Sequence, residues 1–329
     1  MVSFFLVALI PLIMHFSMPD KTPLKRIITV GFSFGGEDTI LYTALEDFFN
    51  KAIEFSLADI DVQYSYAFTN DLLQTSNIRD SIKSKPDVIV IMPQDYLRII
   101  GSIEEAQRAG IPVVMYNRPS DPTSVIQPAA YVGMDTYNQA YTTSIALFKL
   151  MREDGIEPRV INLMGRMTDR NAVLRRDGLY DAAEEMDVEI LADIETNWDS
   201  QTTKDKLVAL YPQYNTANAL FCASDWIMPG VEQAMKQLGR WHPYGHPKHV
   251  YIGSQDVYPL GLTMMYEGYI DVNTAFDIYP MSMMLLQVIL MIVNEQELSQ
   301  SSYLIPGRIV TLNNIESISD LWTEQYMED

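Results

Sequence analysis

The chain has 329 residues, 48% of them hydrophobic, which is enough sequence for two globular domains of ordinary size. Its 43 acidic and 23 basic side chains give a net charge of -20, which repels phosphate backbones and argues against a nucleic-acid partner. The single cysteine, Cys222, excludes an internal disulfide, and its apolar neighbours indicate a small buried side chain.

Residues 1–18 form an apolar stretch without Lys or Arg, and a polar segment follows them. This pattern is typical of an export signal or a short membrane anchor within residues 1–25. Pro11 interrupts the apolar run, which favours a removed signal over a spanning helix. We therefore expect an exported, periplasmic protein, with anchoring through residues 1–18 as the alternative.

From residue 26 onward, short β-branched runs alternate with longer amphipathic ones, as in parallel sheets with crossover helices. The strands expected in the first half are Ile27–Phe32, Ile60–Tyr66, Asp87–Met92, Ile111–Tyr116 and Tyr131–Gly133. The run from Asp87 to Met92 is apolar on both faces, so we expect that strand in the middle of its sheet.

The same alternation then starts again with an expected helix at Asn138–Met151. The strands expected after it are Arg159–Leu163, Val188–Ile194, Ala219–Cys222 and Val250–Gly253. Two successive series of similar length predict an α/β protein of two similar Rossmann-like lobes, each a parallel sheet flanked by helices. The connection near residue 134 should be short, because no Gly/Ser-rich linker lies there.

The residues that follow the expected strands are unusually polar and aromatic. Ligands of open α/β sheets bind at the carboxyl ends of the strands, where loop amides and helix N-termini converge. Carboxylates, amides and guanidinium groups can satisfy many hydroxyls, and a flat aromatic ring can cover the apolar face of a sugar. The residues in these positions are Ser33, Phe34, Asp38, Gln94, Asp95, Asn117, Arg118, Asp135, Ser224, Asp225, Trp226, Gln255 and Asp256.

From residue 26 to the end, the chain resembles the type I periplasmic binding proteins, the group that includes the ribose- and galactose/glucose-binding proteins. The resemblance lies in several short blocks that occur in the family's order and spacing. These are Asp87–Asp95, Glu105–Arg118, Tyr131–Asp135, Arg175–Gly178, Ser224-Asp225 with Gly230, and Glu267–Ile270.

The resemblance implies ligand-contacting roles for particular residues. Asn117 and Arg118 match the family's gripping pair after the fourth strand, Arg175 matches the arginine of the second lobe, and Trp198 matches the tryptophan that stacks on sugars. Asp38 or Ser33 would contribute from the first loop, and Gln255 or Asp256 stands where an aspartate holds ring hydroxyls.

Two departures from the family pattern bear on the ligand. Ser224 stands where an asparagine is usual, and Phe276 replaces the Asn or Gln of the sugar-binding members. Both replacements remove hydrogen-bonding groups, so the pocket is expected to be less sugar-like than the overall resemblance suggests.

The resemblance also implies hinge closure around a small polar ligand, a monosaccharide or related polyol, without a cofactor, a metal or covalent chemistry. The expected N-terminal lobe is 26–133 plus 277–292 and the C-terminal lobe 134–276 plus 293–329, with crossings near Met134–Asp135, Phe276–Asp277 and Ile292–Asn294. The expected partners of this monomer are the permease subunits of an ABC importer. The alternative partner is a membrane sensor kinase or chemoreceptor, as for autoinducer-2-binding relatives.

Three other functions have some support in the sequence. Gly31-Phe-Ser-Phe-Gly35 matches the nucleophile-elbow pattern, but too little sequence precedes it for the earlier strands of an α/β-hydrolase. His242, His246 and His249 could suggest a metal site, yet their prolines and glycine indicate a solvated loop. A repressor effector domain would need a helix-turn-helix of about 60 residues, for which the leader is too short.

Overall fold

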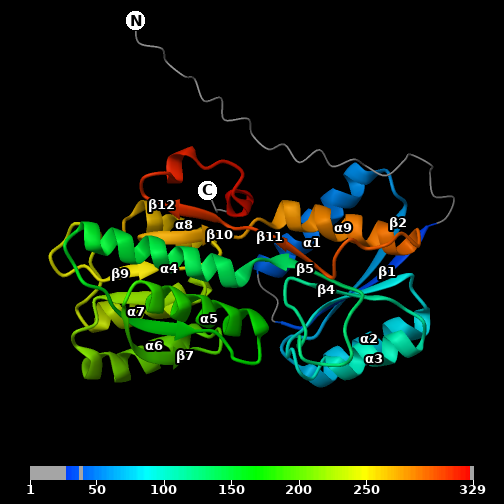
Figure 1. Ribbon diagram of the computed structural model, residues 1–329, viewed down its shortest axis with the longest axis horizontal. Helices are drawn as coiled ribbons and strands as arrows, with labels where there is room; N and C mark the ends of the chain where they lie inside the picture. Colours follow the sequence, from blue (N-terminus) through cyan, green and yellow to red (C-terminus); the bar gives the residue numbers. More distant parts are fainter. Residues whose placement is uncertain (1–26, 37–39, 327–329) are drawn as a thin grey trace, which may run out of the picture.

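The computed structural model describes residues 27–36 and 40–326. The expected signal or anchor segment and Asp38 lie outside the described residues. In the described part, the chain forms two sheets of six strands, side by side and each covered by helices (Figure 1). The predicted fold class, two α/β lobes built on parallel sheets, is confirmed.

The first sheet is entirely parallel. Its strands, in spatial order, are β11 (Ser302–Ile305), β5 (Ala130–Met134), β4 (Val113–Tyr116), β3 (Val88–Met92), β1 (Ile28–Phe34) and β2 (Ile60–Tyr66). Every residue of β3 is buried and the strand lies inside the sheet, as its apolar sequence predicted.

Two helices cover each face of the first sheet. On one face α1 (Ile40–Ser56) packs against α9 (Ile278–Val293), and their apolar side chains share a core with alternate residues of the strands, such as Phe32 and Val90. On the other face lie α2 (Asp71–Ser84) and α3 (Ile100–Arg108). Burial on both faces explains the nearly continuous apolar runs of these strands.

The second sheet repeats this plan, with one antiparallel strand at its edge. Its strands are β12 (Arg308–Thr311), β10 (Val272–Ala275), β9 (Tyr251–Gly253), β8 (Ala219–Cys222), β6 (Arg159–Met164) and β7 (Glu189–Glu195). β12 runs antiparallel to β10. One face is covered by α4 (Thr136–Glu153) and α5 (Arg170–Glu185), and the other by α6 (Ser200–Leu210), α7 (Met228–Gln237) and α8 (Pro259–Tyr266).

The lobe assignment of the C-terminal part needs one correction. The expected boundary gave all of 293–329 to the second lobe, but β11 pairs with β5 in the first sheet. The third crossing therefore lies between Ile305 and Arg308, after the crossings at Asp135 and at Phe276–Asp277. The sequence did not predict β11 because only one of its four residues is fully buried, so its pattern is weak.

Short 3₁₀ turns complete the fold at Tyr211–Tyr214, Asp225–Ile227, Ile315–Ser317 and Trp322–Gln325. Cys222 is buried in β8, as its neighbours indicated. Within the described residues, no helix combines the length and the hydropathy that a membrane span requires.

Candidate ligand-binding cleft

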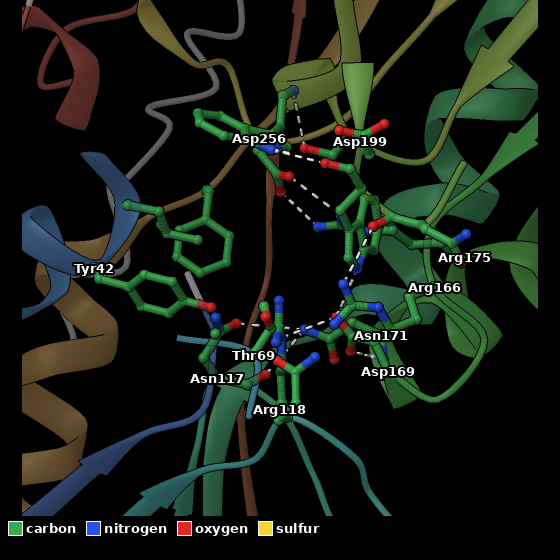
Figure 2. Close-up of a pocket in the computed structure, with 18 of the residues that line it drawn as sticks. Tyr42, Thr69, Asn117, Arg118, Arg166, Asp169, Asn171, Arg175, Asp199 and Asp256 are labelled. Carbon is green, nitrogen blue, oxygen red and sulfur yellow. Dashed lines mark hydrogen bonds and ion pairs between the residues drawn. The ribbon is translucent and has the colours of Figure 1, made fainter. Parts of the chain in front are cut away.

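A cavity of about 300 Å³ lies between the two lobes, where the carboxyl edges of both sheets face each other. Figure 2 shows side chains from both lobes pointing into it. Its lining is mixed in character, with five aromatic rings among charged and amide side chains. The lining residues are Gly36, Leu41, Tyr42, Thr69, Gln94, Asn117, Arg118, Arg166, Asp169, Asn171, Arg175, Asn197, Trp198, Asp199, Ser224, Trp226, Asp256, Tyr258 and Phe276.

Asn117 and Arg118 enter the cleft directly after β4. Asn117 has a left-handed backbone with φ of 59°, a conformation that asparagine tolerates better than most residues. Its backbone carbonyl accepts a hydrogen bond of 3.0 Å from the hydroxyl of Tyr131, which fixes the end of the strand. The structure thus places both residues in the cleft, where the sequence expected them.

Asp169 joins the two lobes. It caps the N-terminus of α5 by accepting from the backbone N–H of Asn171 at 2.9 Å. Its other carboxylate oxygen lies 2.9 Å from Nε of Arg118 in the first lobe and accepts from Nε1 of Trp198 at 3.2 Å. Because Asp169 is only 3% exposed, solvent screens this ion pair weakly.

Other contacts between the lobes come from the same loop, residues 165–171, which we call the latch loop. The side-chain amide of Asn171 donates to the carbonyl of Asn117 at 3.1 Å, and the backbone N–H of Tyr96 donates to the carbonyl of Thr168 at 3.1 Å. The guanidinium of Arg166 lies against the side-chain amide of Gln94. These contacts join the two lobes on this side of the cleft.

Arg175 forms a second buried ion pair, within the second lobe. Its Nη2 lies 2.5 Å from Asp256 Oδ1, and its Nη1 donates to Asp256 Oδ2 at 3.1 Å and to the carbonyl of Ala223 at 2.6 Å. Such a bidentate ion pair fixes the orientation of the guanidinium relative to the carboxylate. It fixes Asp256 at the cleft wall, although the backbone there has φ of 91°.

Trp198 lies in the cleft on a left-handed turn, with φ of 62°. Its ring covers Gly165 so closely that a Cβ at Gly165 would lie 2.0 Å from Trp198 Cζ2. The indole N–H of Trp226 donates to the carbonyl of Trp198 at 3.1 Å. A glycine in the latch loop is thus needed for the tryptophan to adopt this position.

Asp225 lies beneath the cleft and is fully buried. One carboxylate oxygen accepts from the N–H of Tyr258 and from the side-chain amide of Asn273, each at 3.0 Å. The other oxygen has no hydrogen-bond partner among the described residues. Burial, together with the nearby charge of Asp256, raises the pKa of Asp225 well above its ordinary value.

Most of the residues singled out from the sequence meet in this cleft. Those that line it are Gln94, Asn117, Arg118, Arg175, Trp198, Ser224, Trp226, Asp256 and Phe276. Those that do not line it are Ser33, Phe34, Asp95, Asp135, Asp225 and Gln255, and Asp38 lies outside the described residues.

The expected placement of Ser33 and Phe34 was wrong because β1 runs two residues further than predicted. Both residues pair with β2 and β3, and Phe34 is buried in the core of the first lobe. Gln255 is also fully buried. Of the expected alternatives Gln255 or Asp256, only Asp256 faces the cleft.

The sequence reasoning missed several lining residues, and some had a recognisable signal. Asp169 is an acidic residue directly before a helix, which is a common capping position, but capping alone does not indicate a cleft. Tyr42, Thr69 and Tyr258 lie outside the strand ends that were searched. Their presence follows from helix and loop packing, which a single sequence does not reveal.

The other functions weighed from the sequence find little support in the geometry. Ser33 lies inside β1 and is 2% exposed, so it is not on the sharp strand-to-helix turn of a nucleophile elbow. His249 has both ring nitrogens engaged, at 2.7 Å from the carbonyl of His242 and 3.0 Å from Asp271. In the described part of the chain, no group of three His, Cys, Asp or Glu residues could hold a metal ion.

Two similar α/β lobes, three crossings between them and a polar, aromatic cleft at their junction define the class of two-lobed solute-binding proteins. The sequence model of the periplasmic binding protein domain matches residues 30–297. The chain therefore belongs to the periplasmic binding protein family, which confirms the resemblance inferred from its motifs.

Comparisons with individual proteins agree with this assignment. A D-apiose import binding protein of Actinobacillus succinogenes is 23% identical over 168 residues, which cover 51% of this chain and 53% of the relative. The match thus spans about half of that relative's length. A Rhizobium meliloti protein named for rhizopine binding is 24% identical over 76% of this chain and 79% of its own.

Among solved structures, the fructose-binding periplasmic domain of a hybrid two-component system is similar in fold. It superposes with a TM-score of 0.79 at 17% identity, covering 91% of this chain and 94% of that domain. At this level of identity the similarity concerns the fold alone.

Proposed function

We propose that this protein is exported and captures a hydroxyl-rich small molecule, a monosaccharide or a related polyol, by closure of its two lobes. The observation that carries the proposal is the composition of the cleft wall. Aromatic rings of Trp198, Trp226 and Phe276 stand beside the amides and charged groups of Asn117, Arg118 and Asp256. Flat rings suit the C–H faces of sugars, and the polar groups suit their hydroxyls.

The names of the relatives support this ligand class. D-apiose and fructose, which appear in the names of an import binding protein and of the periplasmic domain of a hybrid two-component system, are both sugars. Ser224 and Phe276 reduce the number of hydrogen bonds that the cleft can offer, so among sugars and polyols a ligand with one exposed apolar face fits best.

We infer that the protein delivers its bound ligand to an ABC-type importer. The similarity to the D-apiose import binding protein supports this role. Control of a membrane sensor is the second candidate, and it is favoured by the similarity to the periplasmic domain of a two-component system. Neighbouring genes separate the two, because permease and ATPase genes accompany import and a sensor-kinase gene accompanies sensing.

A thermal-shift screen of the purified full chain tests the ligand class. D-apiose, D-fructose, D-galactose and myo-inositol are the probes, and glycine, glutamate and dialanine are the non-carbohydrate controls. A ligand at about a thousand times its Kd stabilises the native state by about 4 kcal/mol, which raises Tm by several degrees. The proposal fails if only an amino acid or the dipeptide raises Tm.

A further inference from the structure

The C-terminal segment after β12 leaves the second lobe and crosses to the first. We call residues 319–326 the C-terminal strap. Arg308 of β12 holds its start by donating to the carbonyl of Ser319 at 2.9 Å. Leu321 packs in a core of the second lobe, whereas the next residue, Trp322, belongs to a cluster that joins first-lobe residues with Tyr258 of the second lobe. The strap therefore lies at the junction of the two lobes from Trp322 onward.

The far end of the strap is fastened to α1 of the first lobe. The hydroxyl of Tyr326 donates to Asp47 at 2.8 Å, and Lys51 Nζ donates to the side chain of Gln325 at 2.6 Å. The strap is thus a fourth connection between the lobes, in addition to the three crossings of the chain.

Between these anchors, Trp322 contacts the back of the ligand cleft. Its side chain is buried, and its Nε1 donates to the backbone carbonyl of Asp256 at 3.0 Å. Its ring meets the ring of Tyr258 edge to face, with centroids 5.2 Å apart. Asp256 and Tyr258 both line the cleft, so Trp322 touches two lining residues without lining the cleft itself.

The loop that Trp322 contacts has an unfavourable backbone. Asp256 and Val257 have φ of 91° and 54°, in the region that residues other than glycine rarely adopt. Such conformations persist only when surrounding contacts fix them. Besides the strap, the fixing contacts include the N–H of Asp256 to the carbonyl of Thr274 at 2.8 Å and the N–H of Tyr258 to Asp225 at 3.0 Å.

We propose that Trp322 is a positioning residue for the ligand cleft. Its indole N–H holds the carbonyl of Asp256, and through it the loop 255–258, in the backbone conformation that aims Asp256 at Arg175 and Tyr258 at the cleft. Because the strap is anchored on α1, the position of this second-lobe loop is tied to the first lobe. The relative position of the lobes and the shape of the cleft wall are then set together.

Trp322→Phe tests the proposal in the full chain, because phenylalanine keeps an apolar ring but lacks the donor. The matched control is Trp241→Phe. The indole of Trp241 stacks on the ring of Tyr269, with ring centroids 4.4 Å apart, and neither residue lines the cleft. Native-state hydrogen exchange should show the amides of Asp256 and Tyr258 exchanging about tenfold faster in Trp322→Phe than in the wild type. The control should leave them unchanged.

The affinity measurement rests on the proposed function, whereas the exchange measurement does not. For whichever of D-apiose, D-fructose, D-galactose or myo-inositol binds the wild type, Trp322→Phe should raise Kd about tenfold. The proposal would be overturned if the amides of Asp256 and Tyr258 exchanged in Trp322→Phe at the same rates as in the wild type. So would faster exchange spread evenly over both lobes, because Trp322 would then be a general packing residue.

Discussion

Trp198 and the latch-loop glycine beneath it show how single residues shape the cleft. The ring occupies the space that a side chain at residue 165 would fill, and its N–H is held by Asp169. The tryptophan is therefore fixed by protein contacts on its ring and its N–H. A ring fixed in advance loses little side-chain entropy on binding, which favours affinity.

Replacing Trp198 by alanine should weaken sugar binding. Loss of the aromatic surface removes about 1.5 kcal/mol of stacking, which corresponds to about a tenfold higher Kd. Isothermal titration with the sugar found in the screen measures this change. Tyr180→Ala is the control, because Tyr180 is exposed on α5 away from the cleft lining. Equal affinities of Trp198→Ala and the wild type would exclude stacking on this ring.

Asp225 predicts a pH dependence of stability. Burial raises the pKa of Asp225 in the folded protein. Below about pH 4 the Asp225 carboxyl is protonated in both the folded and the unfolded protein, and as pH rises the unfolded protein loses this proton first. Stability is therefore lost progressively as pH increases through the folded pKa. Asp225→Asn keeps an acceptor for Tyr258 and Asn273 and removes the ionisation.

The Tm difference between Asp225→Asn and the wild type should accordingly grow in favour of the variant from pH 4 to pH 8. Thermal unfolding at a series of pH values measures it. A difference that stays constant across this range would mean that Asp225 is already ionised in the folded protein.

At the level of elements, the latch loop closes one side of the cleft. Asp169 in this loop both caps α5 and forms an ion pair with Arg118 of the other lobe. Asp199 also caps a helix, α6, by accepting from the N–H of Thr202 at 2.6 Å. The described residues include no ion-pair partner for Asp199. These two aspartates form a natural pair of variant and control.

Asp169→Asn should favour the open form of the ligand-free protein. The amide oxygen of asparagine still caps the helix, whereas the charge that holds Arg118 is lost. Opening lets Arg118 reach water, so a larger radius of gyration in small-angle X-ray scattering is the expected result. Asp199→Asn should leave the radius unchanged. The latch would be disproved if Asp169→Asn were as compact as the wild type at neutral pH.

Some of the strands could be predicted from the sequence and others could not. The buried strands β1, β3, β6 and β8 were predicted because their apolar runs are continuous and their ends are marked by turns. β11 and β12 were not, since each has only one fully buried residue and their positions depend on pairing with distant strands. The end of β1 was misplaced because Gly31 and Ser33 resemble turn residues inside a strand.

The candidate site was predictable to the extent that it lies at strand ends. Asn117, Arg118, Ser224 and Asp256 follow β4, β8 and β9, and parallel topology brings such positions together. The residues that the latch loop and α1 contribute could not be predicted, because their place depends on how the two lobes face each other. That relation is a property of the whole molecule.

At the scale of the whole molecule, two lobes of one construction enclose a cleft that is latched on one side and backed by the C-terminal strap. A ligand favours the closed form only if it binds that form better than the open one. The contacts between the lobes lower the free-energy cost of closing them. We therefore expect a compact ligand-free protein whose lobes move only slightly further together when a sugar binds.

We expect a sugar or polyol to bind between the lobes, and isothermal titration calorimetry measures this binding. The full chain is titrated with D-apiose, D-fructose, D-galactose and myo-inositol, beside the double variant Asn117→Ala/Trp198→Ala, which removes one cleft side chain from each lobe. We expect saturable binding of one ligand molecule per chain to the wild type and no measurable heat with the double variant. Undiminished binding by the double variant, or no binding of any of the four solutes by the wild type, would show that this expectation is wrong.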